Sequence, residues 1–229
     1  MSIFVIADLH LSLGSNKPMD VFHGWSDYVE RLRENWDKIV KDTDIVVVAG
    51  DISWAMKLEE TYNDFKLIHE RPGKKLFLKG NHDYWWTTKN KMDNYLKEKG
   101  FDTIEIIHNS AFIHEDMAVC GTRGWMYNSV SDEDKKITLR EAGRLKTSLE
   151  AAKNAGVRPV AFLHYPPVYG DFVSEEIMNT LKAYGVKDCY YGHIHNSLAA
   201  KKAIIGEYDG IRMHLISCDT IGFCPVLVR

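Results

Sequence analysis

The residues in this chain that could do chemistry are Asp, Asn and His side chains gathered in five short clusters. In chain order the clusters are Asp8-Leu9-His10, Gly50-Asp51, Gly80-Asn81-His82-Asp83, His164 and Gly192-His193-Ile194-His195. Most of them come directly after an apolar run that is typical of a buried strand. Open α/β sheets bind ligands beyond the carboxyl ends of their strands. The repetition of this context predicts a metal site that is assembled from several strands.

The types of donor atom narrow the choice of metal. The candidate ligands offer carboxylate or amide oxygens and imidazole nitrogens, and none offers sulfur: Asp8, His10, Asp51, Asn81, His164, His193 and His195. Such a set suits Mn²⁺, iron (Fe²⁺ or Fe³⁺) or Zn²⁺ better than copper(I) or an all-oxygen calcium site. It is too large for one tetrahedral ion. Two ions of higher coordination number that share a carboxylate would use all of it.

The elements that must position these residues follow from the hydrophobic pattern. Within the first hundred residues, expected strands at 3–7, 45–49 and 75–78 alternate with expected helices at 27–41, 58–70 and 88–99. This alternation predicts mainly parallel strands in an α/β fold.

The rest of the chain has a different order of elements. We expect strands at 103–107 and 111–121, with a hairpin turn at Glu115-Asp116, and then helices at 132–154 and 175–184 on either side of a strand at 159–163. A weaker strand pattern lies at 189–191, and the tail contains strand-like runs at 211–217 and 225–228. Since no repeat, low-complexity tract or linker interrupts the chain, we expect a single domain over residues 1–229.

Composition limits the class of protein. The chain has 229 residues, is 45% apolar and carries a net charge of −3, so it lacks the Lys and Arg excess of sequence-independent nucleic-acid binders. Its four cysteines form no C-x-x-C pair, which favours buried free thiols in a reducing compartment. The sequence shows no signal-peptide pattern and no apolar run of membrane-spanning length. We therefore expect a cytoplasmic protein that has no membrane partner.

The ordered set D-x-H, G-D, G-N-H-D, H and G-H-x-H resembles the calcineurin-like metallophosphoesterase superfamily. Its landmarks run from Asp8 to His195, about four-fifths of the chain. G-D and a lone His are common elements, whereas G-N-H-D after a strand is fairly specific and the complete ordered set is strongly specific. The resemblance implies a fold of two mixed β-sheets packed face to face as a sandwich with helices outside, the four-layer αββα arrangement.

The resemblance also implies a role for each matching residue. The implied metal ligands form two sets joined by a bridge: Asp8, His10 and His195 for the first ion, Asn81, His164 and His193 for the second, and Asp51 for both. His82 would not bind metal and would donate a proton to the leaving group or stabilise charge on phosphate. Asp83 would orient and polarise His82.

The implied activity is that of a dinuclear metal-dependent phosphohydrolase that cleaves phosphoester bonds with a metal-activated hydroxide. The favoured substrate is a small phosphomonoester or phosphodiester, while cyclic nucleotides and pyrophosphates need the same core and stay open. Trp54 argues against the Ser/Thr protein phosphatase branch, which usually extends G-D with acidic and Arg residues.

Two alternatives to this activity remain. The first is a nuclease that acts on DNA or RNA, which the low charge opposes. The second is a non-catalytic interaction protein that keeps the fold. It predicts lost ligands or a lost His82, yet all of these residues are present.

Three further features lie outside the five clusters. Arg123 stands near two glycines and suits bidentate phosphate binding, and an exposed turn explains it equally well. For His23, in the long segment 11–26, a surface-loop role is favoured over a catalytic one. A set of aromatic residues close to the motifs could line a pocket for a base or aryl group, but packing is the favoured explanation: Trp54, Trp85, Trp86, Trp125 and Tyr127.

Overall fold

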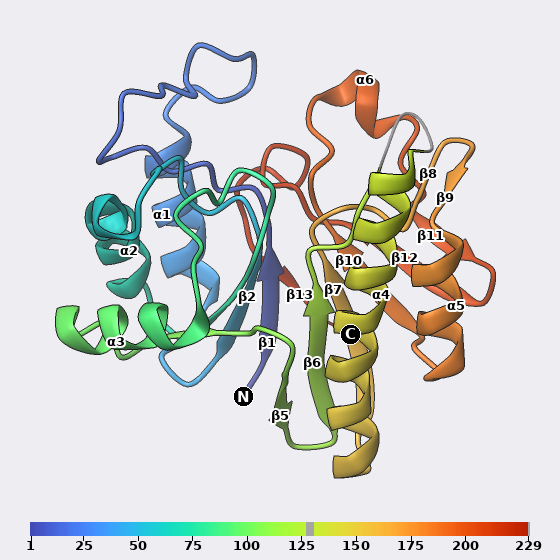
Figure 1. Ribbon diagram of the computed structural model, residues 1–229. Coiled ribbons are helices and arrows are strands. Elements are labelled where there is room, and N and C mark those ends of the chain that lie inside the picture. The colour runs from blue at the N-terminus through green and yellow to red at the C-terminus, as the bar shows by residue number, and fades with distance from the viewer. Residues whose placement is uncertain (127–130, 229) are drawn as a thin grey trace. The chain divides into compact units, whose positions relative to one another are not determined.

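The computed structural model describes residues 1–126 and 131–228, and most of its elements are labelled in Figure 1. By its internal contacts the chain divides into two compact units. The first contains residues 1–106 and the segment from Ile216 onward, and the second contains Ile107–Leu215. Each unit is built on a mixed sheet with helices, so the predicted α/β class with two mixed sheets is confirmed. The expectation of a single domain stays a prediction.

The sheet of the first unit has the strand order β13-β1-β2-β3-β4. The strands are β1 (Ile3–Ile6), β2 (Ile45–Ala49), β3 (Lys74–Leu78), β4 (Ile104–Ile106) and β13 (Val226–Leu227). Strands β1 to β4 are parallel, and β13 pairs antiparallel with β1. All five residues of β2 are buried, which explains its unbroken apolar run.

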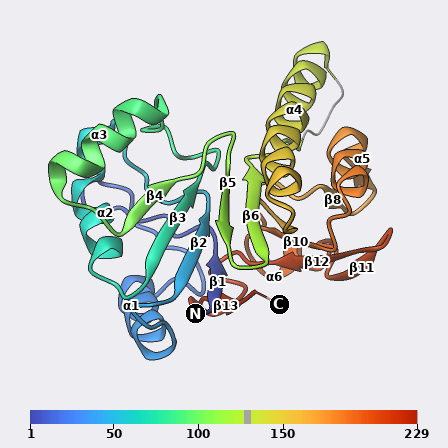
Figure 2. The same ribbon diagram turned by 90° about the horizontal axis from the view of Figure 1, so that it is seen from below.

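The helices of the first unit connect its parallel strands. They are α1 (Tyr28–Ile39), the 3₁₀ turn η1 (Leu58–Thr61), α2 (Tyr62–His69) and α3 (Lys89–Lys99). Figure 2 shows α1, α2 and α3 along one face of the sheet. Leu32, Trp36, Phe65 and Met92 from the helices share a buried cluster with the strand residue Phe77. The helical spacing of the apolar residues is therefore explained by burial against this face.

The sheet of the second unit has the strand order β11-β12-β10-β7-β6-β5. The strands are β5 (Ala111–His114), β6 (Met117–Thr122), β7 (Arg158–Leu163), β10 (Asp188–Tyr191), β11 (Gly206–Tyr208) and β12 (Ile211–Leu215). The inner four strands are parallel, and β5 and β11 pair antiparallel at the two edges. The turn between β5 and β6 falls at the predicted Glu115-Asp116.

Two longer helices cover this second sheet. They are α4 (Asp132–Ala155) and α5 (Glu175–Ala183), and a short α6 (Ser197–Ala200) follows β10. Leu145 and Leu149 of α4 and Leu181 of α5 are buried together with strand residues such as Leu163 and Met213. A separate hairpin contains β8 (Val168–Tyr169) and β9 (Phe172–Val173).

The differences from the expected elements are short or terminal. The sequence did not predict β8, β9, β11 or α6, because two to four residues carry no periodic signal. The expected strand at 211–217 ends at Leu215, and Ser217 instead bridges to Ala7 in the first unit. The expected helix at 58–70 begins as a 3₁₀ turn.

The cysteines are free thiols, and Cys120, Cys189 and Cys218 are buried, as predicted. Burial raises the pKa of the Cys120 thiol to about 12, so this group is unreactive. Among the described residues, no helix combines the length and the apolar character that crossing a membrane requires.

Candidate functional site

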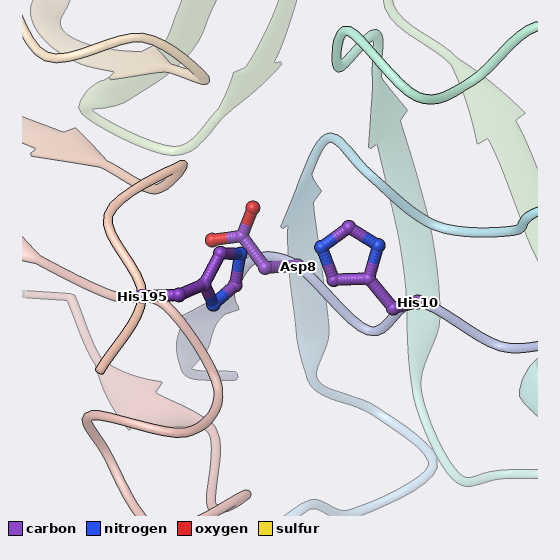
Figure 3. A group of neighbouring side chains, drawn as sticks. All are labelled: Asp8, His10 and His195. Atoms are coloured by element: carbon purple, nitrogen blue, oxygen red, sulfur yellow. The ribbon is translucent and has the colours of Figure 1, made fainter. Parts of the chain in front are cut away.

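Three loops of the first unit carry six of the predicted site residues. Asp8 and His10 follow β1, Asp51 follows β2, and the segment Asn81–Asp83 follows β3. Figure 3 shows Asp8 and His10 as sticks on the loop that leaves β1; it also labels His195 of the second unit. Asp8, His10 and Asp51 are buried, and all three have positive φ angles, of 63°, 45° and 51°. Such backbone strain is typical of functional sites.

Backbone hydrogen bonds join the first two loops. The Asp8 N–H donates to the Gly50 carbonyl over 2.9 Å, and the His10 N–H donates to the Asp51 carbonyl over 2.9 Å. The Leu11 N–H continues this pairing with the Ile52 carbonyl. These bonds fix Asp8 and His10 beside Asp51, so the first unit brings together three of the predicted ligands.

The two carboxylate oxygens of Asp51 have different neighbours. Oδ1 accepts a hydrogen bond of 2.8 Å from the His82 backbone N–H, and Oδ2 lies 3.7 Å from His10 Nε2. The second distance is too long for a hydrogen bond and is compatible with two donors to one ion. The absence of a side chain at Gly80 lets Asp51 Oδ1 lie close to the loop after β3, because a Cβ at position 80 would be 2.1 Å from that oxygen.

Asp83 is a buried acceptor that ties the second and third loops together. Its Oδ2 accepts from the backbone N–H groups of Asp51 and Gly80, at 2.9 and 2.7 Å. Its Oδ1 accepts from the Ile52 N–H at 2.8 Å and from Trp85 Nε1 at 3.1 Å. The sequence did not predict this organising role, and the predicted action of Asp83 on His82 stays a prediction.

His82 is surrounded by aromatic rings within the first unit. Its ring centroid lies 4.4 Å from that of Trp54 and 5.9 Å from that of Tyr84. The Tyr84 hydroxyl lies 3.3 Å from His82 Nδ1. Trp54 also stacks on His10, with ring centroids 5.0 Å apart. Tyr84 was not among the predicted site residues; its place two residues after His82 is the signal that could have suggested it.

Asp64 is a second buried carboxylate that supports these loops. It accepts a hydrogen bond from the Leu13 backbone N–H at 2.8 Å and another from the Ser53 hydroxyl. Burial raises the pKa of Asp64, although these two hydrogen bonds oppose the shift. An acidic residue on the buried face of α2 was the sequence signal for this role.

The second unit carries the other predicted histidines. His164 follows β7 and is buried, while His193 and His195 follow β10 and are half-buried. The His164 and His193 ring centroids are 5.2 Å apart, and the Tyr165 ring lies 4.2 Å from His193. The Gly192 N–H donates to the His164 carbonyl over 3.1 Å. The unit thus brings His164 and His193 together and holds His193 against an aromatic ring.

Arg123 follows β6 and lies beside a buried carboxylate. Its guanidinium is 3.9 Å from Glu141 and 4.8 Å from the Trp125 ring centroid. Glu141 also accepts hydrogen bonds from Thr122 and Arg144. Burial lowers the pKa of Arg123, and the Glu141 carboxylate opposes that shift. Arg123 Nε is enclosed and has no hydrogen-bond partner among residues 1–126 and 131–228.

The remaining candidates have simpler surroundings. His23 is exposed in its loop, in line with the favoured surface role. Trp85 is buried and packs edge-on against Phe65, which confirms the packing interpretation for that residue. Tyr127 lies outside the described residues.

The donor chemistry fits hard or borderline divalent ions. In the first unit one carboxylate oxygen of Asp8 and one nitrogen of His10 lie within 4.8 Å of each other, and in the second unit one nitrogen each of His164 and His193 do so. Together the two pairs offer one carboxylate oxygen and three imidazole nitrogens, which are donors that manganese, iron and zinc accept.

Comparisons with solved structures agree with this picture at the level of the fold. A protein of unknown function from Aquifex aeolicus is 15% identical, with a TM-score of 0.55, and the alignment covers 99% of this chain and 95% of the other. A phosphopantetheinyl hydrolase from Mycobacterium tuberculosis is 14% identical, with a TM-score of 0.53 and the same coverage. A protein from Thermus thermophilus is 11% identical, with a TM-score of 0.56, over 99% and 97% of the two chains.

Sequence comparisons address the family. No curated protein sequence matches the chain significantly. The profile of the calcineurin-like phosphoesterases matches residues 1–197, which include every predicted metal ligand. Members of this family act on phosphoester bonds with divalent metal ions, and the Asp and His donors described above are of the type that such ions need. The chain belongs to the calcineurin-like phosphoesterase family.

Proposed function

We propose that the protein is a phosphohydrolase that uses two divalent metal ions to cleave a small phosphomonoester or phosphodiester. The proposed ligands are Asp8, His10 and His195 for one ion, Asn81, His164 and His193 for the other, and Asp51 for both. When bound, such ions supply Lewis-acid charge that activates water and stabilises the phosphoryl oxygens. Manganese, iron and zinc all suit these donors.

The observation that carries the proposal is the setting of Asp51. It is buried at the carboxyl end of β2, with Oδ1 fixed by the His82 N–H and Oδ2 facing His10 Nε2 at 3.7 Å. A buried carboxylate that the backbone holds 3.7 Å from an imidazole nitrogen gains little as an ion pair. The same two groups are well placed to bind one metal ion together.

His82 is the residue proposed to move a proton. With the Tyr84 hydroxyl 3.3 Å from Nδ1, Nε2 is the nitrogen that would donate a proton to the leaving oxygen. Asp83 acts on the position of His82 indirectly, because it holds Gly80 and the Asp51 loop. We assign Arg123 to substrate binding, where its guanidinium would donate to a phosphoryl oxygen.

The reaction type has support from outside the site. The phosphopantetheinyl hydrolase from Mycobacterium tuberculosis shares the fold, and its name describes a hydrolase. Hydrolysis of a phosphoester is therefore the reaction we expect here.

Metal analysis together with turnover tests the proposal. Protein prepared with Mn²⁺ should contain about two ions per chain and should hydrolyse at least one substrate in a screen of monoesters, diesters and pyrophosphates. Asp51→Asn should lower the metal content and reduce turnover by about 10²-fold or more.

His82→Ala in the same experiment separates proton transfer from metal binding. It should keep the metal content and still lose about 10²–10⁴-fold in turnover. His23→Ala, an exposed histidine, is the matched control and should behave as wild type. Well under one ion per chain in wild-type protein would overturn the dinuclear assignment, and loss of metal in His82→Ala would make His82 a ligand.

A further inference from the structure

We propose that the substrate carries a second phosphate group, which is not cleaved and which binds to an arginine cluster of the second unit. The arginine cluster consists of Arg123, Arg140 and Arg144, whose side chains meet at the buried carboxylate of Glu141. This inference rests on the proposed function and deepens it, because it names the class of substrate that the same site would take.

The first observation is that the three guanidinium groups surround one carboxylate oxygen. Glu141 Oε1 lies 2.7 Å from Arg144 Nη1 and 3.8 Å from Arg140 Nε. The same oxygen lies 3.9 Å from Arg123 Nη2. The other oxygen, Oε2, accepts a hydrogen bond from the Thr122 hydroxyl. An anion that contacts one guanidinium of the cluster is therefore within reach of the other two.

The second observation is that the cluster carries more positive than negative charge. Three guanidinium groups and one carboxylate leave two positive charges unbalanced, because among the described residues only Glu141 forms an ion pair with the cluster. In the acidic first turn of α4, Asp132 pairs with Lys135, and Asp134 accepts a hydrogen bond from Trp125. A phosphate ester has a charge of about −1.5 to −2 at neutral pH, which matches this excess better than a carboxylate does.

The like charges of the cluster oppose one another in the absence of an anion. Arg140 and Arg144 are four residues apart on α4, the spacing at which like charges destabilise a helix. Burial lowers the pKa of Arg123, and although Glu141 opposes this shift, the charges of Arg140 and Arg144 lower the pKa further. A bound dianion would remove this repulsion, and the guanidinium fork matches phosphate oxygens.

The third observation is that a ligand can reach the arginines but not the carboxylate between them. The side chains of Arg140 and Arg144 are 55% and 34% exposed, and that of Arg123 is 17% exposed. The Glu141 side chain is fully buried. A ligand that approaches from solvent would therefore meet guanidinium groups.

The fourth observation links the cluster to a predicted metal ligand of the same unit. Strands β6 and β7 pair in parallel, with Thr122 opposite Leu163. Arg123 and His164 are therefore the next residues along the two strands, at their carboxyl ends. The Tyr165 N–H donates to the Arg123 carbonyl over 2.8 Å. Because neighbouring strands lie about 4.8 Å apart, a small molecule can span from His164 to the cluster.

Binding of phosphonates, which are not hydrolysed, tests the inference directly. Titration calorimetry on the Mn²⁺-loaded protein compares propylphosphonate with the α,ω-bisphosphonates from ethane- to pentane-bisphosphonate. The bisphosphonate of best length should bind at least about ten-fold more tightly than propylphosphonate, since its second group gains charge-assisted hydrogen bonds. This ratio of affinities, the bisphosphonate gain, cancels any general change in the site.

Two variants locate the second phosphonate. Arg140→Gln should lower the bisphosphonate gain about three-fold, as expected for an exposed charge. It should fold normally, because Arg140 lies 3.8 Å from Glu141, too far for a hydrogen bond. The double variant Arg140→Gln, Arg144→Gln should abolish the gain. Lys146→Gln, Lys153→Gln, which removes two exposed charges of α4 outside the cluster, is the matched control and should keep the full gain.

The possible failures are distinguishable. If propylphosphonate binds and methyl phosphate is hydrolysed while no bisphosphonate binds more tightly, the inference is wrong and the proposed function stands. A bisphosphonate gain that both arginine variants leave intact would also overturn the inference. If no phosphonate binds and no phosphoester is hydrolysed, the proposed function fails and takes the inference with it. Binding of single-stranded RNA that the double variant weakens, without a bisphosphonate gain, would assign the cluster to nucleic acid and overturn the inference.

Discussion

The two units hold their site residues by different means. In the first unit, buried carboxylates accept hydrogen bonds from the backbone of neighbouring loops, with Asp83 serving Asp51, Ile52 and Gly80. In the second unit, His193 packs against the Tyr165 ring. The buried carboxylate of Glu141 accepts hydrogen bonds from side chains, those of Thr122 and Arg144. Loops fixed through backbone N–H groups cannot adjust when the acceptor is lost, whereas side chains can turn. The first unit should therefore be the less tolerant of change.

The strongest way to break this comparison is to replace one buried carboxylate in each unit by its amide. Asp83→Asn puts an NH₂ group opposite at least two donors in either orientation, because Oδ2 of Asp83 accepts from two N–H groups and Oδ1 from three. We expect a loss of about 2–4 kcal/mol in the free energy of unfolding. Urea denaturation followed by tryptophan fluorescence measures it.

Glu141→Gln is the matched variant in the second unit. Its amide oxygen can keep the hydrogen bond from Arg144, and the Thr122 hydroxyl can turn to accept from the amide NH₂. We expect a smaller loss of about 1–2 kcal/mol, since the Arg144 side chain is partly exposed while the more buried Arg123 also loses the charge beside it. If Asp83→Asn and Glu141→Gln lowered the free energy of unfolding equally, backbone and side-chain donors would tolerate the loss of an acceptor equally well. The difference that we infer between the two units would then be wrong.

The dependence of stability on acid gives a second, smaller contrast. In the second unit, burial acts to raise the pKa of Asp188, but hydrogen bonds from Arg212 and His214 outweigh it and lower the pKa. The stability that Asp188 contributes is present above the pKa of an unfolded Asp and is lost as the pH falls through the lower folded value. In the first unit, burial raises the pKa of Asp64, so protonation of Asp64 relieves a cost as the pH falls.

Urea denaturation at pH values from 7 down to 3 separates these contributions. Asp188→Asn should cost about 1 kcal/mol at pH 7 and flatten the loss of stability in acid, because its paired charge is gone. Asp64→Asn should make the loss in acid steeper than in wild type, since a stabilising protonation is removed. The same acid slope in both variants would contradict the assigned pKa directions.

The amount that the sequence could predict differs between elements for a physical reason. The ends of β1, β2 and β3 were predictable because each apolar run stops at a polar cluster, and Asp8 and Asp51 stand where expected. The role of Asp83 was not predictable, because its carboxylate accepts hydrogen bonds from the backbone of Asp51 and Ile52, 32 and 31 residues earlier in the chain. Only the folded sheet brings these segments together. Trp54 was interpreted as a packing residue, because an aromatic side chain beside a motif has the same sequence signal in either role.

The smallest expected effect concerns how each unit orients a histidine. His82 has the Tyr84 hydroxyl 3.3 Å from Nδ1 at an exposed position, so water competes for that nitrogen. His193 instead has the whole Tyr165 ring against it, at 4.2 Å. If orientation in the first unit comes from the loop backbone, Tyr84→Phe should lower kcat only about two- to three-fold and leave KM unchanged, because the ring is kept. Tyr62→Phe, another partly exposed tyrosine of the first unit, is the control. A loss of about 10²-fold in kcat for Tyr84→Phe would show that the hydroxyl, rather than the backbone of the loop, orients the His82 ring. The contrast between the two units would then be wrong for this histidine.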